Sequence, residues 1–272
     1  MKPIDKINQL FKNKTIQNKH YLQQGITNDN YYFEVDNQAR VIRIPKKGNQ
    51  QLFDYHHEEQ VLHLIAALDI DVPLLYYNAN NGIKVTEFIP NAEHFDIRYR
   101  QRATLLIKKL HQAKIKTGKI YSIKNSFKKY QALIKNPIYD TSFAWSVLDE
   151  IENLNYEPIL CHNDLVEGNF LFTKNHDYLI DYEYAMDNHP YFDLMSFITE
   201  NDIQDQKARE EIYLTYFGHL PSAQEQATLL LFERGLHVLW CEWGMAMYEL
   251  HQEQIYHDIA ALKYQRLKET YQ

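Results

Sequence analysis

Residues 161–169 read Cys161-His162-Asn163-Asp164-Leu165-Val166-Glu167-Gly168-Asn169, and an acid, Asp181, follows further along the chain. Between them lie an apolar run (170–172), a polar stretch (173–177) and a second apolar run (178–180). This pattern is typical of two short strands joined by a turn. A hairpin folded at that turn brings its first and last residues together. We therefore expect Asn169 and Asp181 to lie side by side at its open end.

The two side chains at this open end carry oxygen atoms that suit Mg²⁺, a hard cation that takes a few protein oxygens together with phosphate and water. Asp164 precedes the hairpin, where a carboxylate can accept the proton of an incoming hydroxyl. The full spacing, His-x-Asp-x-x-x-x-Asn and then two apolar residues and Asp, resembles the catalytic loop and metal-binding acid of protein-kinase-like enzymes. His, Asn and Asp are also common turn residues, but the complete combination favours phosphoryl transfer.

The composition is that of a globular protein, 45% hydrophobic and 24% charged, and its 272 residues are enough for two lobes or for one large domain. A net charge of −7 disfavours nucleic acid as a partner, because phosphate binding needs clustered positive charge. The two cysteines have no metal-type or disulfide-type spacing, and no run of eighteen apolar residues occurs. We expect a cytoplasmic protein without membrane insertion; its oligomeric state is left open.

The order of the expected elements is that of an α+β protein. The N-terminal third contains expected helices at 4–11 and 55–68 and expected strands at 31–35, 40–44, 74–77 and 83–89. After Pro90 the pattern is helical, at 98–113, 142–154, 191–199, 206–217 and 223–248, interrupted by the catalytic hairpin. We therefore expect a two-lobed, protein-kinase-like fold. A small β-rich lobe (1–89) would bind nucleotide, and a larger helical lobe (90–272) would contain the catalytic hairpin and bind the substrate.

Several further motifs complete a family resemblance. The catalytic stretch, with Leu179-Ile180-Asp181-Tyr182-Glu183-Tyr184, Asn188, Phe192-Asp193-Leu194 and Glu200-Asn201, resembles the choline/ethanolamine kinases of the aminoglycoside-phosphotransferase-like group. Aminoglycoside phosphotransferases usually carry Gly where this chain has Asn163. The resemblance implies an ATP- and Mg²⁺-dependent kinase that phosphorylates the hydroxyl of a small amino alcohol, with choline favoured. It makes Asp164 the catalytic base and Asn169 and Asp181 the metal ligands.

The resemblance also implies a set of nucleotide-binding residues in the first lobe. The turn at 25–31 would cover the phosphates, and residues 87–89 match the connector whose backbone groups pair with adenine. Arg43 stands where protein kinases have Lys; it can direct two donors at phosphate oxygens, and Glu58 matches the acid that holds it. Either charge alone also fits an ordinary surface position. The implied nucleotide-binding residues are Thr27, Asn28, Asn30, Arg43, Glu58, Glu87 and Ile89.

Two tryptophans point to the acceptor. Trp240 and Trp243 share one face of the expected helix, and the family pattern Trp-x-x-Trp implies aromatic walls that hold a trimethylammonium group by cation–π attraction. The same spacing is also typical of core packing. Glu200 matches an acid near the cationic head group, and Asp193 matches a residue that braces the catalytic loop.

One departure from the choline kinases concerns the last helix. The tyrosine that often completes the aromatic cage falls at Ile259, so Tyr248 or Tyr256 would have to replace it. Ethanolamine, thiamine and aminoglycosides therefore remain alternative acceptors. Outside enzymes, the alternative is a catalytically silent nucleotide-binding module, against which the joint presence of the three catalytic polar residues argues.

Overall fold

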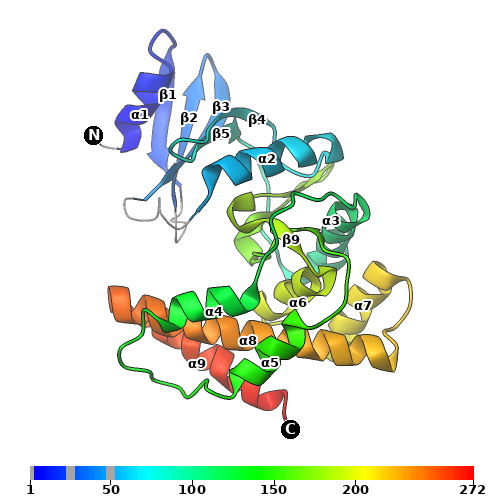
Figure 1. Cartoon of the computed structure of the whole chain (residues 1–272). Coiled ribbons are helices and arrows are strands. Elements are labelled where there is room, and N and C mark those ends of the chain that lie inside the picture. Colours follow the sequence, from blue (N-terminus) through cyan, green and yellow to red (C-terminus); the bar gives the residue numbers. More distant parts are fainter. Residues whose placement is uncertain (1–2, 23–27, 47–52) are drawn as a thin grey trace. The chain divides into compact units, whose positions relative to one another are not determined.

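A five-stranded antiparallel sheet forms near the N-terminus (Figure 1). The computed structural model describes residues 3–22, 28–46 and 53–272. The strand order is β1-β2-β3-β5-β4. The strands are β1 (Ile16–Tyr21), β2 (Asn28–Val35), β3 (Gln38–Pro45), β4 (Leu74–Asn78) and β5 (Ile83–Glu87), and the helical segments of this part are α1 (Pro3–Leu10), α2 (Tyr55–Ile65) and η2 (Ala66–Leu68).

The two faces of this sheet differ in chemistry, because successive side chains of a strand point to opposite faces. One face is an apolar cluster to which α1 contributes Ile7, and its strand members are Phe33, Val35, Ile42, Ile44, Ile83 and Val85. The residues between these apolar positions, among them Arg43 on β3 and Lys84 on β5, lie on the other face. That polar face is connected to α2, because Arg43 forms an ion pair with Glu58 of that helix.

The catalytic hairpin forms as expected, from β7 (Phe170–Phe172) and β8 (Asp177–Leu179). Contacts divide the chain into two units, 1–95 with 168–185 and 96–167 with 186–272. The expected boundary at 89/90 left the hairpin in the C-terminal lobe, whereas these contacts group it with the sheet. The reason is backbone hydrogen bonding: the Leu179 N–H donates to the Ile70 carbonyl (2.7 Å) and the Glu93 N–H to the Phe172 carbonyl (2.9 Å).

The second unit is mainly helical. Its longest helix, α8, begins at a reciprocal capping box in which Ser222 and Glu225 satisfy each other's backbone N–H groups. Within the described residues, none of the helices combines the length and the apolar composition of a membrane span. The helices are α3 (Arg100–Gln112), α4 (Ile123–Gln131), α5 (Ala144–Glu152), α6 (Pro190–Glu200), α7 (Gln206–Phe217), α8 (Ala223–His251) and α9 (Gln254–Glu269), with η3 (Ile97–Tyr99) and two short strands, β6 (Ile159–Cys161) and β9 (Met186–Asn188).

Helices α8 and α9 lie side by side (Figure 1). They approach closely at Gly244. A Cβ atom at this position would come within 2.9 Å of the Tyr256 carbonyl oxygen and the Ala260 nitrogen. Such a distance is too short for a carbon atom in contact with backbone, so only glycine permits this spacing of the two helices. The close approach places Tyr256 of α9 against α8.

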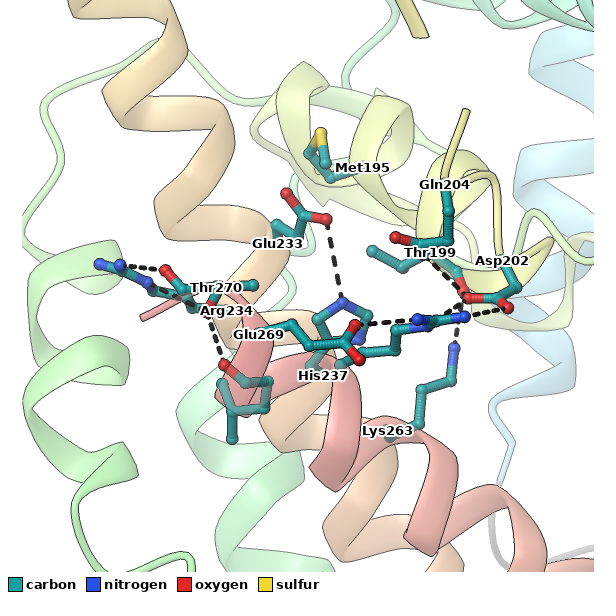
Figure 2. Close-up of polar contacts among 12 residues, drawn as sticks. Met195, Thr199, Asp202, Gln204, Glu233, Arg234, His237, Lys263, Glu269 and Thr270 are labelled. Carbon is teal, nitrogen blue, oxygen red and sulfur yellow. Dashed lines mark hydrogen bonds and ion pairs between the residues drawn. The ribbon is translucent and has the colours of Figure 1, made fainter. Parts of the chain in front are cut away.

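Polar contacts tie the end of α6 to α9, and α8 to the end of α9 (Figure 2). Arg266 donates to both carboxylate oxygens of Asp202, each at 2.8 Å. His237 of α8 is buried, and its Nε2 lies 3.9 Å from a carboxylate oxygen of Glu233 on the same helix. Burial, together with the positive charge of Lys263, lowers the pKa of His237 to about 3, so its ring is neutral at physiological pH.

Candidate active site

A buried arginine lies at the centre of the site in the first unit. Arg43 donates from Nη2 to Glu58 at 2.6 Å and from Nη1 to Asp181 at 2.7 Å, and its Nη1 lies 3.8 Å from Glu183. Glu58 also accepts a hydrogen bond from the Tyr77 hydroxyl (2.8 Å). Strand β3 contributes Arg43, helix α2 contributes Glu58, and the end of the hairpin contributes Asp181. The fold therefore assembles this charged cluster from three separate elements.

Charge pairing outweighs the cost of burying this arginine. Burial opposes the charge on Arg43, but the carboxylates of Glu58 and Asp181 reverse that effect and raise its pKa well above the ordinary value. Arg43 is therefore a permanent cation with a fixed guanidinium plane. Its two terminal nitrogens donate to Asp181 and Glu58, and its positive charge attracts phosphate oxygens.

The open end of the hairpin has the geometry that the sequence predicts. Phe170 pairs with Leu179, and the Ile180 N–H donates to the Asn169 carbonyl at 2.8 Å, so Asn169 and Asp181 stand at the same end. Asp181 has a left-handed backbone (φ 71°), which turns the chain into η5 (Tyr182–Tyr184). Asn169 is buried, whereas the Asp181 side chain keeps 27% exposure. Amide and carboxylate oxygens at this position fit a hard divalent cation.

The negative charge of the cluster supports that fit. Asp181 and Glu183 both lie near Arg43, which also neutralises Glu58. Among the described residues, three carboxylates thus surround one guanidinium. An added divalent cation would balance the excess charge, and Asp181 and Asn169 are the residues placed to hold it.

The expected phosphate-covering turn is described only in part. Thr27 lies outside the described residues. Asn28 is buried and donates from Nδ2 to Glu183 at 2.9 Å. Asn30 is the register partner of Arg43 across β2 and β3, so both side chains lie on the same face of the sheet. Asn28 and Asn30 therefore border the arginine cluster.

The expected adenine connector follows β5. The Glu87 N–H donates to the Pro73 carbonyl and the Phe88 N–H to the Ala39 carbonyl, each at 3.1 Å. The side chain of Glu87 is exposed, and Ile89 is half-buried. These hydrogen bonds hold the connector against both neighbouring chain segments.

The catalytic loop of the second unit is braced by a buried acid. Asp193 of α6 accepts the His162 N–H through Oδ2 and the Asn163 N–H through Oδ1, both at 2.7 Å. Asn163 has a left-handed backbone (φ 64°), which accounts for a small polar residue or glycine at this position. Its Oδ1 accepts a hydrogen bond from Asn188 of β9 (2.8 Å). These contacts fix the backbone that carries Asp164.

Asp164 is half-buried, and two tyrosines lie within its electrostatic reach. Burial raises the pKa of Tyr121 to about 12, and the negative charge of Asp164 adds to the shift. Burial and the same carboxylate also raise the pKa of Tyr130. The backbone holds Tyr121 near the loop, because its N–H donates to the carbonyl of Asp187 in β9 (2.9 Å). No pattern in the sequence pointed to either phenol.

A group of potential metal ligands lies behind this loop. The side chains of His111, Cys161 and Asp193 are buried, and their ligand atoms lie within 4.8 Å of one another. Hydrogen bonding accounts for the group, because His111 links Asp193 (3.0 Å) to the Tyr216 hydroxyl (2.6 Å). Burial and the charge of Asp193 raise the pKa of the Cys161 thiol well above its usual range, which makes it a poor metal ligand. We interpret the group as a brace for the catalytic loop.

The two tryptophans belong to an aromatic cluster of three rings. Trp240 and Trp243 have ring centroids 5.9 Å apart at 84°, and Trp243 meets Tyr256 at 5.6 Å and 76°. Trp240 is buried, its indole nitrogen has no hydrogen-bond partner among the described residues, and Trp243 is half-buried. The tyrosine that contacts Trp243 is therefore Tyr256 of α9, whereas Tyr248 of α8 packs on His257.

Glu200, the acid expected near the cationic head group, has an internal partner. Its Oε1 lies 3.3 Å from Lys263 Nζ, which also donates to the Thr199 carbonyl at 2.8 Å. Burial raises the pKa of Glu200, although Lys263 opposes this shift. Because Lys263 already balances Glu200, the aromatic faces of Trp240, Trp243 and Tyr256 are the better candidates for holding an ammonium group.

Residues 21–228, more than half of the chain, match the family described as "Phosphotransferase enzyme family" (APH). The chain belongs to this family. One similar protein is LicA of Haemophilus influenzae, 27% identical over 200 residues, which cover 68% of this chain and 58% of that protein. The chain thus matches little more than half the length of that relative.

Comparison with solved structures shows that this phosphotransferase has the expected α+β, protein-kinase-like fold. The choline kinase LicA from Streptococcus pneumoniae superposes with a TM-score of 0.82 at 23% identity, covering 98% of this chain and 96% of that one. A LicA complex with AMP gives a TM-score of 0.81 at 22% identity with the same coverage. A choline/ethanolamine kinase family protein from Mesorhizobium loti gives 0.77 at 20% identity, covering 93% and 88%.

Proposed function

We propose that this phosphotransferase transfers the γ-phosphoryl group of ATP to the hydroxyl of a small amino alcohol, with choline as its substrate. The observation that carries the proposal is the buried Arg43, held between Glu58 and the hairpin acid Asp181. This arrangement joins a phosphate-binding cation to a potential metal ligand. The AMP found in a LicA complex supports an adenine nucleotide as the donor.

The residues have distinct roles in this proposal. Arg43 orients the phosphates, and the connector carbonyl of Glu87 and N–H of Ile89 pair with adenine. Asn169 and Asp181 would hold Mg²⁺, which would supply positive charge to the transferred phosphoryl group. Asp164 orients the acceptor hydroxyl and takes its proton.

Choline is proposed because the acceptor side offers aromatic surface. Trp240, Trp243 and Tyr256 meet edge to face, and such rings attract a quaternary ammonium through their electron-rich faces. A primary ammonium is better hydrated and loses more on entering such a site. The aromatic cluster therefore favours choline over ethanolamine.

An ADP-release assay with a panel of acceptors tests the proposal. The panel contains choline, ethanolamine, thiamine and aminoglycosides, each with and without Mg²⁺, and Asp164→Asn serves as the inactive control. We expect the highest kcat/KM with choline. Higher activity with another acceptor would reject choline and retain phosphoryl transfer, whereas ATP binding without turnover of any acceptor would indicate a silent module.

A further inference from the structure

A second buried cation stands beside Arg43. Lys84 lies on β5 between the core residues Ile83 and Val85, so it points to the opposite, polar face of the sheet. It is the direct register partner of Arg43 on β3 and of Tyr77 on β4. Directly opposite residues of antiparallel strands carry their side chains on the same face. Arg43, Lys84 and Tyr77 therefore form one row.

Burial makes this lysine unusual. Its exposure is only 5%, and lysines are almost never this buried unless an acid balances them. The nearby acid is Asp71, between η2 and β4, whose carboxyl interacts electrostatically with Lys84. The charges of Asp181 and Glu58 also act on Asp71. Because Lys84 is the register partner of Arg43, Lys84 and Asp71 belong to the same charged region as the arginine and its acids.

The charges of this cluster can be counted among the described residues. Two cations, Arg43 and Lys84, face four acids, which gives a net charge of 2 − 4 = −2 when all are ionised. One divalent cation brings that sum to zero, and the phosphates can then approach without net repulsion. Loss of Lys84 alone would leave −3, or −1 with the metal in place. The four acids are Glu58, Asp71, Asp181 and Glu183.

We propose that Lys84 is a positioning residue of the nucleotide site, which together with Arg43 sets the charge of the carboxylate cluster so that the metal and the phosphates bind together. The inference rests on the nucleotide-binding half of the proposed function. It predicts that the importance of Lys84 grows with the number of phosphates on the ligand. A lysine that only supports the fold would affect all ligands alike.

Isothermal titration of adenosine, AMP, ADP and Mg·ATP into the full-length protein separates these roles. Lys84→Met should leave adenosine affinity unchanged and weaken Mg·ATP binding roughly tenfold, the order expected when one unit charge is lost from a partly buried charged cluster. Lys84→Arg should bind like the wild type. Lys14→Met, which removes an exposed lysine paired with Asp36 in the same unit, is the control and should change nothing.

A charge-neutral double variant makes the test sharper. Lys84→Met combined with Asp71→Asn removes one charge of each sign and restores −2, so Mg·ATP affinity should return close to the wild-type value. If Lys84→Met alone does not fold, the double variant is compared with Asp71→Asn, which should bind Mg·ATP more tightly than the double variant. Melting temperatures identify the folded variants.

The outcomes distinguish this inference from the proposed function. Equal weakening of all four ligands, unchanged Mg·ATP affinity in Lys84→Met, or a double variant no better than the single one would overturn the role of Lys84. A wild-type protein that binds Mg·ATP but phosphorylates no amino alcohol would contradict the proposed reaction and leave the titration valid. A wild-type protein that binds no adenine nucleotide would overturn both.

Discussion

Replacement of Trp243 by leucine tests the aromatic acceptor site directly. Trp243 is the central ring of the cluster, between Trp240 at 5.9 Å and Tyr256 at 5.6 Å. Leucine keeps an apolar side chain on α8 but removes the electron-rich face. A desolvated cation–π contact is worth about 2 kcal/mol, or roughly thirtyfold in affinity. We therefore expect the KM for choline to rise by that factor while the KM for ATP stays unchanged.

The assay compares choline with 3,3-dimethylbutan-1-ol, its neutral isostere, in which carbon replaces the charged nitrogen. Cation–π attraction acts only on choline, so Trp243→Leu should lower kcat/KM for choline far more than for the neutral alcohol. Trp145→Leu is the matched control, because Trp145 is also half-buried in the same unit and packs on Phe127 (5.1 Å). It should lower the melting temperature without changing the ratio of the two substrates.

The reasoning would be refuted by an equal loss for both alcohols. A tryptophan that only fills the core would also behave differently, because truncating a large buried aromatic side chain typically costs about 3–5 kcal/mol of stability and damages every kinetic parameter together. Trp243→Leu with a strongly lowered melting temperature and an unchanged preference for choline would therefore assign the cluster to core packing.

Three further predictions concern the catalytic loop, the metal site and the buried histidine. Asp164→Asn should reduce turnover about 10²–10⁴-fold at unchanged ATP affinity, measured by single-turnover kinetics and titration, because it removes the proton acceptor; turnover within a few-fold of wild type would contradict this role. Asp181→Ala should weaken Mg·ATP binding in calorimetry and raise the Mg²⁺ requirement, and unchanged affinity would argue against the hairpin metal site. The unfolded chain protonates a histidine near pH 6.5, whereas burial lowers the pKa of native His237 to about 3, so stability should fall as pH drops from about 6.5 toward 3. His237→Gln should flatten this fall in melts between pH 7.5 and 5; parallel curves would show that another group causes it.

The catalytic hairpin was predictable because its evidence is local. Two apolar runs around a polar turn fix the pairing of Phe170 with Leu179, and the positions of Asn169 and Asp181 follow from that pairing. The resemblance likewise implied the contact between Arg43 and Glu58, and the structure confirms it at 2.6 Å. Helix α7 begins and ends where the sequence places it, between the cap at Asp205 and the left-handed Gly218.

The sequence patterns did not predict two elements that bury little surface, β1 and α4. Strand β1 reads IQNKHY and has no buried residue, so its sequence lacks the apolar alternation by which a strand is recognised. Helix α4 buries only Ile123 and Phe127. Both elements form because neighbouring segments supply hydrogen bonds or packing, and composition does not contain that information.

Sequence patterns also did not predict the contacts in the site between residues far apart in the chain. Glu183 lies in the recognised Asp-Tyr-Glu-Tyr box, but its contact with Asn28 spans 155 residues. The row of Arg43, Lys84 and Tyr77 depends on the register of three strands. Tyr256 reaches Trp243 because two helices cross closely, whereas alignment of the last helix pointed to Ile259. Each of these contacts follows from tertiary geometry rather than from a local pattern.

The close crossing at Gly244 has a consequence for how acceptor preference could change. The spacing of α8 and α9 sets the gap between Trp243 and Tyr256, and that spacing depends on the absence of a single methyl group. Alanine at this position would push the helices apart and widen the space between the rings. If the proposed acceptor site is right, a residue outside the aromatic cluster could thus retune the head-group size that the site accepts, and an evolving or engineered phosphotransferase could exchange one amine for another without replacing any of the three aromatic residues.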